Sequence, residues 1–283
     1  VVMAAGKGTR MKSALPKVLH PLAGRSLLHH VLVTTSGLGA SLTAVITGHE
    51  AAQVEAATAG MAGVRCVRQE PQLGTGHAVQ QAVPLLPDAG TTLILNGDVP
   101  LIEAATARAL AAACGGAKLA LLTIELLDAT GYGRIVRNDK QEVRAIGEHK
   151  DASESQRAIR EVYTGMLAAP TARQKRAVMA LENQNVQQEF YLTDIVAMAV
   201  AEGMSVVATQ AKSETEVLGV NSPMQLADLE RRFQRRQAEA LMEAGVRLAG
   251  PARFDLRGTL QCGQDVSIDV GCVFEGAVTL GDN

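Results

Sequence analysis

Residues 1–11 read Val-Val-Met-Ala-Ala-Gly-Lys-Gly-Thr-Arg-Met, an apolar run that leads into a glycine-rich turn. We predict a buried strand over residues 1–5, because a short apolar run that stops at glycine is typical of one. The two glycines let backbone N–H groups approach a ligand, and Arg10 and Lys17 add charge that suits a polyphosphate. The turn matches neither the Walker A nor the G-x-G-x-x-G pattern, so a tight turn without a ligand is an equal interpretation of these residues alone.

Outward from this stretch, strand and helix signals alternate along the chain. Expected strands are residues 42–47, 64–67, 91–95 and 119–124, and expected helices are residues 26–36, 50–59, 77–86 and 103–113. Such alternation predicts an α/β fold, a Rossmann-like open mixed sheet, mostly parallel, with helices on both faces. Ligands of these sheets bind at the carboxyl ends of the strands, and the glycine-rich turn follows one such end.

A long helix is predicted over residues 222–245. Ser222 is a suitable N-cap, Gln225 can complete a capping box, and Gly245 is a suitable stop. Apolar residues recur between them at helical spacing. The arginines between residues 231 and 236 predict a solvated face paired with neighbouring glutamates, with an anionic partner as the alternative.

After this helix, apolar residues recur every six positions in two registers. These are Phe254, Leu260, Val266, Cys272 and Val278, and Leu256, Cys262, Ile268, Phe274 and Leu280. A six-residue period predicts a parallel β-helix, in which each hexad forms one short side of a coil. The chain stops at Asn283 within the pattern, so we expect it to be the front part of a longer protein.

Composition excludes several classes of function. The 283 residues have a formal net charge of -2, 2% aromatic residues and no Trp, which argues against nucleic acid or an anionic membrane as a partner. No apolar run is long enough for a transmembrane helix, and no secretory leader is visible. The four cysteines have neither zinc nor redox spacing, and free thiols in a reducing cytoplasm are expected rather than a bridge between Cys262 and Cys272.

Polar clusters follow two of the predicted strands. Asp98 ends an apolar strand, where one carboxylate together with substrate phosphates would suit Mg²⁺, although Asp is also an ordinary turn residue. Gln69 has an amide that can read a base edge, and Thr75 lies between two glycines ahead of a helix that it could simply cap. Neither H-E-x-x-H nor G-x-S-x-G occurs, so zinc protease and serine hydrolase chemistry have no support.

An ordered set of motifs resembles one family across essentially the whole chain. The motifs are AAGKGTRM (4–11), LPKVLH (15–20), LGTGHA (73–78), GDVPL (97–101), GYGRI (131–135), EHKDA (148–152), YLTDI (191–195), GVN (219–221) and PARFDLRGTL (251–260). They resemble the bacterial N-acetylglucosamine-1-phosphate uridylyltransferases, the N-terminal half of a bifunctional enzyme. In that family the second half is a left-handed β-helix with glucosamine-1-phosphate acetyltransferase activity.

The resemblance implies nucleotide-binding roles by motif position. The nucleotide would be lined by the backbone of Met3, Ala4, Ala5 and Gly6. Arg10 and Lys17 would be catalytic, since they would bind and neutralise the UTP phosphates. Uracil would be read by Gln69, Gly74 and Thr75. The ribose and metal would lie near Asn96, Gly97 and Asp98.

Metal and sugar contacts are implied in the same way. Asp98 and Asn221 would hold Mg²⁺, and Gly133, Glu148 and position 163 would contact N-acetylglucosamine. Two positions depart from the family pattern. Tyr163 stands where Asn is usual, and a phenol cannot reproduce the paired donor and acceptor of an amide. Gln188 stands where Gly is usual, which could reshape its loop.

The implied reaction is transfer of UMP from UTP to N-acetylglucosamine-1-phosphate, giving UDP-N-acetylglucosamine and pyrophosphate. The sugar phosphate is already anionic, so in-line attack on the α-phosphorus needs no general base, and Mg²⁺ with Arg10 and Lys17 would offset the repulsion. Alternatives are a glucose-1-phosphate uridylyl- or thymidylyltransferase and a catalytically silent assembly module.

The resemblance also implies how the chain is divided and what it belongs to. We expect a uridylyltransferase domain at 1–221, a linker helix at 222–245 and the truncated start of a left-handed β-helix at 246–283. The acetyltransferase site would lie outside this chain, and the full-length protein would be a homotrimer. Its product would supply peptidoglycan and lipopolysaccharide synthesis.

Overall fold

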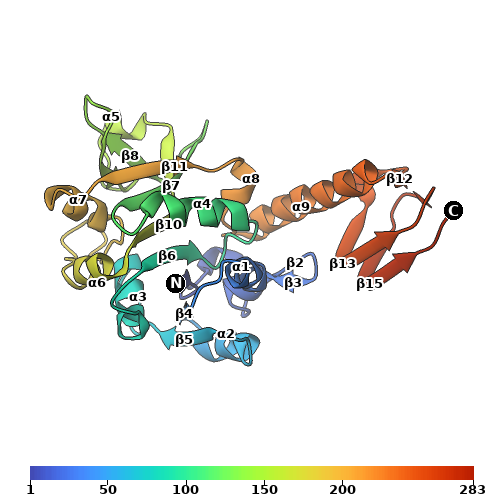
Figure 1. The fold of residues 1–283 in the computed structure, drawn as a ribbon, viewed down its shortest axis with the longest axis horizontal. Helices are drawn as coiled ribbons and strands as arrows, with labels where there is room; N and C mark the ends of the chain where they lie inside the picture. The colour runs from blue at the N-terminus through green and yellow to red at the C-terminus, as the bar shows by residue number, and fades with distance from the viewer.

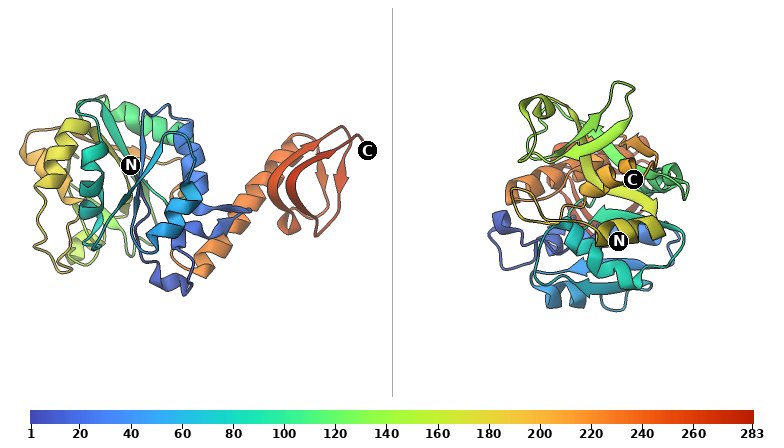
Figure 2. Two further views of the ribbon diagram at one scale, coloured as in Figure 1. Left: turned by 90° about the horizontal axis from the view of Figure 1, so that it is seen from below. Right: turned by 90° about the vertical axis from the view of Figure 1, so that its left-hand side faces the viewer.

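The computed structural model describes residues 1–283 as an α/β body, a long helix that leads away from it, and a set of β coils at the far end (Figure 1). Figure 2 shows the same arrangement from two other directions. No helix is both long and apolar enough to cross a membrane.

The body is built on a nine-stranded sheet whose main path runs β11-β7-β10-β6-β1-β4-β5. Its strands are β1 (Val2–Met3), β4 (Thr43–Thr47), β5 (Val64–Arg68), β6 (Thr91–Asn96), β7 (Leu119–Glu125), β8 (Gly133–Arg137), β9 (Val143–Gly147), β10 (Glu161–Pro170) and β11 (Val206–Gln210). Most neighbours on the path are parallel, but β10 is antiparallel to both β6 and β7, and β8 pairs with β10 and β9. The predicted open mixed sheet is therefore confirmed.

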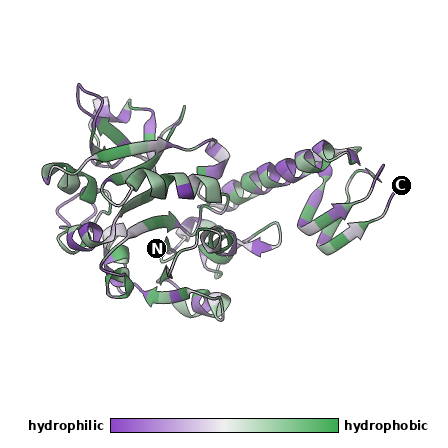
Figure 3. Cartoon of the chain, viewed as in Figure 1, coloured by the Kyte–Doolittle hydropathy of each residue, from purple (hydrophilic) through white to green (hydrophobic).

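Helices cover both faces of this sheet. One face packs under α1 (Leu27–Ser36), α2 (Ala51–Thr58) and α4 (Ala104–Cys114), and the other under α3 (Thr75–Ala82), α6 (Thr171–Met179) and α7 (Asp194–Ala201). The short helices α5 (Glu154–Arg157) and α8 (Glu214–Val217) and the hairpin β2 (Pro21–Leu22) and β3 (Arg25–Ser26) complete the body. The central strands are largely green in the hydropathy colouring, as expected for strands that are buried on both sides (Figure 3).

One predicted helix differs in its bounds from residues 77–86. The helix α3 begins at Thr75 and ends at Ala82, and residues 83–85 continue as a 3-10 turn. Pro84 explains the early end, because it has no N–H to donate to the carbonyl of the preceding turn.

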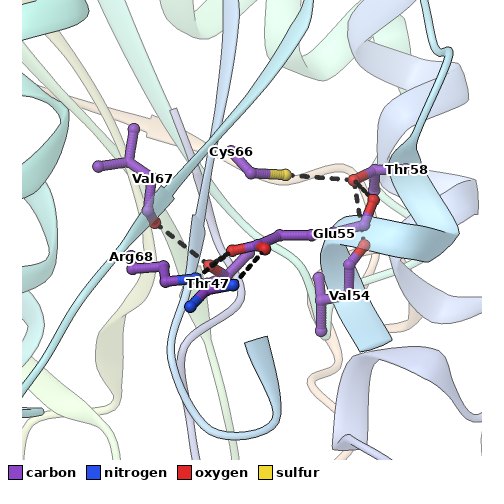
Figure 4. Close-up of polar contacts among 7 residues, drawn as sticks. All are labelled: Thr47, Val54, Glu55, Thr58, Cys66, Val67 and Arg68. Carbon is purple, nitrogen blue, oxygen red and sulfur yellow. Dashed lines mark hydrogen bonds and ion pairs between the residues drawn. The ribbon is translucent and has the colours of Figure 1, made fainter. Parts of the chain in front are cut away.

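Polar contacts tie the crossover helix α2 to the strands that it connects (Figure 4). The Arg68 guanidinium donates to both carboxylate oxygens of Glu55 at 2.7 Å, and Thr47 Oγ1 donates to Glu55 at 3.2 Å. The Arg68 side chain is well exposed, so the pair contributes little to stability. It fixes the end of β5 one residue before Gln69.

The long helix α9 spans Pro223–Glu243, within the predicted range. Ser222 Oγ caps it by accepting from Gln225 N at 3.3 Å, but the predicted capping box is wrong. Gln225 Oε1 accepts instead from the backbone N–H of Asn221 at 2.8 Å, one residue earlier than a capping box requires.

The arginines of α9 form ion pairs, as predicted for a solvated face. Arg232 pairs with Asp228 and Arg235 with Glu239, each one turn along the helix. The outer two reach other elements, since Arg231 pairs with Asp255 and Arg236 with Glu103. Glu230 does not pair with an arginine; it accepts from Ala23 N at 2.8 Å and from Gln234, so it joins the helix to the hairpin.

The C-terminal residues form stacked parallel coils. The strand β12 (Arg247–Leu248) pairs with β14 (Ser267–Ile268), and β13 (Asp255–Cys262) pairs with β15 (Val273–Leu280). Asp255 lies opposite Val273, eighteen positions later, which is three hexads per coil. The two predicted registers form the core of this unit, with Phe254, Leu256, Val266 and Ile268 buried beside Ala238 of α9. Every cysteine is a free thiol, as expected.

Candidate functional site

The glycine-rich turn closes over the carboxyl ends of β1 and β6. Met3 and Asn96 are register partners, and Gly97 N donates to Met3 O at 2.9 Å. A Cβ on Gly97 would lie 3.1 Å from that same oxygen, so glycine permits the close approach. A Cβ on Gly6 would meet nothing within 4 Å, which leaves this part of the turn open to a ligand.

A cavity of about 420 Å³ lies beside this turn. Ten predicted site residues line it: Met3, Ala4, Ala5, Gly6, Lys17, Gln69, Gly74, Thr75, Asn96 and Asp98. Four polar residues to which the sequence analysis gave no role also lie in or beside the site: Lys7, Gln72, Glu189 and Thr193. Thr193 belongs to the YLTDI motif, and its place in that motif was the only sequence signal that could have pointed to it.

The turn at Gly74 is held from two sides. Gln69, only 3% exposed, donates from Nε2 to Gly74 O at 2.9 Å, which leaves its Oε1 free to accept. Gly74 has φ +107, and a Cβ there would lie 2.7 Å from Phe190 O. Phe190 N in turn donates to Leu73 O at 2.8 Å. Thr75 does not cap α3, because its Oγ1 accepts from Leu192 N at 3.0 Å.

A second cluster lies where β8, β9 and β10 meet. Gly133 is the register partner of Tyr163, and a Cβ on Gly133 would come within 3.8 Å of Glu148 Oε2. Glu148 Oε1 accepts from Thr193 Oγ1 at 2.8 Å. Burial raises the pKa of the Glu148 carboxyl, and the hydrogen bond from Thr193 opposes that rise. The cluster therefore combines a desolvated carboxylate with a phenol.

The Tyr163 side chain is buried, and its hydroxyl has no hydrogen-bond partner. Burial raises the pKa of this phenol, and the nearby charge of Glu148 raises it further, so it is a neutral donor. A buried hydroxyl without a partner is costly, and a ligand that accepts from it would remove the cost.

Residues 189–193 connect the two clusters. The backbone of Phe190 bonds the turn at Gly74, and Leu192 N donates to Thr75. The hydroxyl of Thr193 then donates to Glu148. Gln188 immediately before it has φ 55, the left-handed conformation that glycine adopts most easily. The loop thus keeps a glycine-like backbone at the position where the sequence departs from the family pattern.

Three polar side chains distant in sequence meet beside the cavity, whose lining includes Lys17 and Asp98. Lys17 Nζ donates to Asp98 Oδ2 and, at 3.0 Å, to Asn221 Oδ1. Asp98 follows β6, and Asn221 directly precedes the cap of α9. Val220 N donates to Asp98 O at 2.9 Å, so the two segments are also joined through their backbones.

Arg10 is the predicted residue that stands apart from these contacts. It lies exposed in the 3-10 turn Thr9–Met11 and is not among the residues that line the cavity. The cavity lining also leaves out Asn221, Gly97, whose position is given above, and the second cluster of Gly133, Glu148 and Tyr163.

Comparison with known sequences gives two results. The family profile described as the MobA-like NTP transferase domain matches residues 1–128. A protein of Methylibium petroleiphilum named "Bifunctional protein GlmU" is 71% identical over 288 residues, covering 100% of this chain and 63% of that protein. One of the same name from Polaromonas naphthalenivorans is 61% identical, covering 98% of this chain and 61% of that protein. The chain therefore spans less than two thirds of the relatives that it matches.

Solved structures agree on the fold. A nucleotidyl transferase from Methanothermobacter thermautotroptrophicus has a TM-score of 0.60 at 23% identity and covers 83% of this chain and 96% of its own. A UDP-glucose pyrophosphorylase complexed with UDP-glucose has a TM-score of 0.66 at 16% identity, covering 83% and 97%. At such identities the likeness establishes the Rossmann-like nucleotidyltransferase fold of the body.

Proposed function

Because the chain is homologous over its whole length to part of the proteins named bifunctional protein GlmU, we propose that it transfers UMP from UTP to N-acetylglucosamine-1-phosphate. The products are UDP-N-acetylglucosamine and pyrophosphate. The observation that carries the proposal is the meeting of Lys17, Asp98 and Asn221 beside a glycine-lined cavity at the carboxyl ends of β1 and β6.

The nucleotide occupies the cavity of about 420 Å³. Uracil carries an N–H donor at N3, and the free Oε1 of Gln69 supplies the matching acceptor. Cytosine lacks that proton, which supports UTP as the substrate. The backbone from Met3 to Gly6 faces the nucleotide, and Lys17 of the cavity lining neutralises the phosphates. Arg10, in the turn that follows the glycines, contributes a second positive charge.

Asp98 and Asn221 fit the cofactor that we propose, Mg²⁺. They offer one carboxylate and one amide oxygen, and no group of three or more His, Cys, Asp or Glu forms a protein cage elsewhere. Mg²⁺ commonly uses one or two protein ligands together with substrate phosphates. The chemistry that it supplies when bound is neutralisation of charge between the two phosphates.

The sugar lies on the second cluster, with Gly133, Glu148 and Tyr163 as contacts. The unpartnered Tyr163 hydroxyl is a neutral donor, and the Glu148 carboxylate is an acceptor held by Thr193. Attack needs no general base, because the sugar phosphate is already an anion. The protein residues therefore act by placing two anions in line and by stabilising charge.

We further propose a division into a uridylyltransferase domain at 1–221, a linker helix at 222–245 and the start of a left-handed β-helix at 246–283. Support comes from the change at α9 from a nine-stranded sheet to stacked parallel coils. The acetyltransferase activity and the homotrimer belong to the full-length protein. The free cysteines fit the reducing cytoplasm that we propose as its location.

The test is pyrophosphate release from UTP with and without Mg²⁺, with N-acetylglucosamine-1-phosphate and glucose-1-phosphate offered in parallel. We expect metal-dependent release and a strong preference for the acetamido sugar. A preference for glucose-1-phosphate would overturn the substrate, and no release with either would favour a silent module.

A variant pair tests the metal residue. Losing one such electrostatic contact costs on the order of 3 kcal/mol, or about a hundredfold in rate, so Asp98→Ala should lower turnover at least about a hundredfold with the fold intact. Asp88→Ala is the control, because Asp88 is exposed and pairs only with Lys175 at the surface. Parent-like turnover in Asp98→Ala would remove Asp98 from the metal site.

A further inference from the structure

The ammonium of Lys17 lies between the two oxygen atoms assigned to the metal. Its Nζ donates to Asp98 Oδ2 and to Asn221 Oδ1 at 3.0 Å. The Lys17 and Asp98 side chains are 12% and 20% exposed, so the pair is largely shielded from water. A single cation thus already joins a carboxylate and an amide that lie more than one hundred residues apart.

The two oxygen-bearing residues are held independently of this ammonium. Val220 N donates to Asp98 O at 2.9 Å, and Asn221 N donates to Gln225 Oε1 at 2.8 Å. The backbone of Gly8 packs closely on the stem of Lys17, since a Cβ on Gly8 would lie 2.7 Å from Lys17 Cβ. The end of the lysine side chain is consequently the part of this group that can change partners while the ligands stay in place.

Two cations compete for these oxygens, because the ammonium already occupies Asp98 Oδ2 and Asn221 Oδ1. Mg²⁺ requires oxygen ligands at about 2.0–2.1 Å in near-octahedral geometry, whereas the ammonium needs the same lone pairs for its hydrogen bonds. Like charges that close together also repel strongly in a shielded site. We propose that Lys17 is a placeholder for the divalent cation, so that metal binding to Asp98 and Asn221 requires Lys17 to leave them.

The adjoining cavity can supply the new partner of Lys17. Its lining includes Lys17, Asp98 and the residues from Met3 to Lys7, and on the proposed function it receives the nucleoside triphosphate. A triphosphate offers Lys17 a new anionic partner and so frees both oxygens. Metal and nucleotide therefore bind cooperatively, and the protein alone binds the metal weakly. This inference rests on the proposed metal site and adds the role of Lys17 in gating it.

The experiment measures Mn²⁺ binding to the 283-residue chain by electron paramagnetic resonance, with and without UTP. The variants are Lys17→Met, which keeps the length and removes the ammonium, and Lys7→Met. Lys7 lines the same cavity but makes no hydrogen bond to Asp98 or Asn221, so it controls for the loss of one positive charge. Thermal unfolding with and without Mn²⁺ is recorded for each protein.

Without UTP, Lys17→Met should bind Mn²⁺ about tenfold or more tightly than the parent, and Lys7→Met should stay within about threefold of it. UTP should tighten Mn²⁺ binding to the parent far more than to Lys17→Met. Mn²⁺ should raise the Tm of Lys17→Met more than that of the parent, which also reports that the variant is folded. Equal Mn²⁺ affinity of the parent and Lys17→Met, or an equal gain in both variants, would overturn the placeholder while leaving the metal site standing. No Mn²⁺ binding by any of the three proteins, even with UTP, would overturn the metal site itself.

Discussion

Gln234 holds the first coil onto the linker helix, and its removal has a cost that can be worked out from the contacts. The side chain is 1% exposed and bonds both backbone groups of Leu256: Nε2 donates to Leu256 O at 3.0 Å, and Leu256 N donates to Oε1 at 2.7 Å. Gln234→Leu keeps most of the volume but leaves two buried backbone groups without partners. At about 1–3 kcal/mol for each orphaned group, the coil should lose about 2–6 kcal/mol.

Native-state hydrogen exchange is the assay, because it reads each unit of the chain separately. A loss of about 2 kcal/mol corresponds to roughly thirtyfold faster exchange, so amides of β13 should exchange at least that much faster. Amides of β6 and β7 in the body should be unchanged. The control is Gln237→Leu, since Gln237 is half-buried on the same helix and its side chain makes no hydrogen bond.

The control variant should stay within about 0.5 kcal/mol of the parent. Unchanged exchange of β13 in Gln234→Leu would refute the reasoning, because it would mean that apolar packing alone holds the coil to α9. Equal losses in both variants would refute it as well, since the hydrogen bonds would then not be the cause.

Three further predictions concern the site. Gln188→Gly should raise the free energy of unfolding by about 0.5–1 kcal/mol, because glycine removes the cost of φ 55 and only part of the gain is lost to chain entropy; a lower Tm in this variant would contradict it. Gly74→Ala should weaken UTP binding about tenfold or more in calorimetry, because its Cβ would lie 2.7 Å from Phe190 O at φ +107, whereas Gly60→Ala at φ +79 meets nothing and should bind UTP as the parent does. Burial raises the pKa of Glu148 above its ordinary 4.5, so the folded protein holds that proton more tightly and loses stability as pH rises from 4.5 through the folded-state value. Glu148→Gln cannot ionise, so its Tm relative to the parent should increase over that pH range, and a constant difference would exclude Glu148 as the source.

The spacing of apolar residues, together with the glycine and proline residues that end each element, was enough to predict the parallel half of the body and the coils. The strands β1, β4 and β6 are short and mostly apolar, β5 alternates apolar residues with arginine, and a helix follows each of the four further along the chain. The hexads of residues 254–280 give the coil spacing directly, because eighteen positions separate paired residues. In both regions the local sequence pattern and the tertiary contacts favour the same element, so short stretches of sequence are enough to predict it.

The sequence analysis predicted no strand or helix between β8 and α8. The strand β10 is buried almost throughout and antiparallel to both neighbours on the main path, with a register shift between Tyr163 and Leu167. The residues of a buried strand do not indicate whether it runs parallel or antiparallel to its neighbours. Periodicity also does not predict the irregularity around Gly165. The capping box at Ser222 failed for a related reason: Gln225 binds the backbone N–H of Asn221 instead of that of Ser222, and sequence spacing does not distinguish the two.

The segment that joins the cavity to the second cluster shows why the order of motifs along the whole chain predicts contacts that short stretches of sequence cannot. Residues 189–193 have no regular secondary structure, yet Phe190 closes on Leu73 and Gly76 at 2.8 Å and 2.7 Å while Thr193 holds Glu148 at 2.8 Å. Each bond joins residues 45 or more positions apart, so no propensity of the segment itself predicts it. What is fixed locally is the left-handed turn at Gln188, which starts the segment in the right direction at a cost of about 1–2 kcal/mol. That the loop keeps this conformation without glycine argues that its long-range bonds, rather than its local preferences, determine its path. A single segment then sets both the Gly74 turn and the Glu148 carboxylate, so a change within it should disturb nucleotide and sugar binding together.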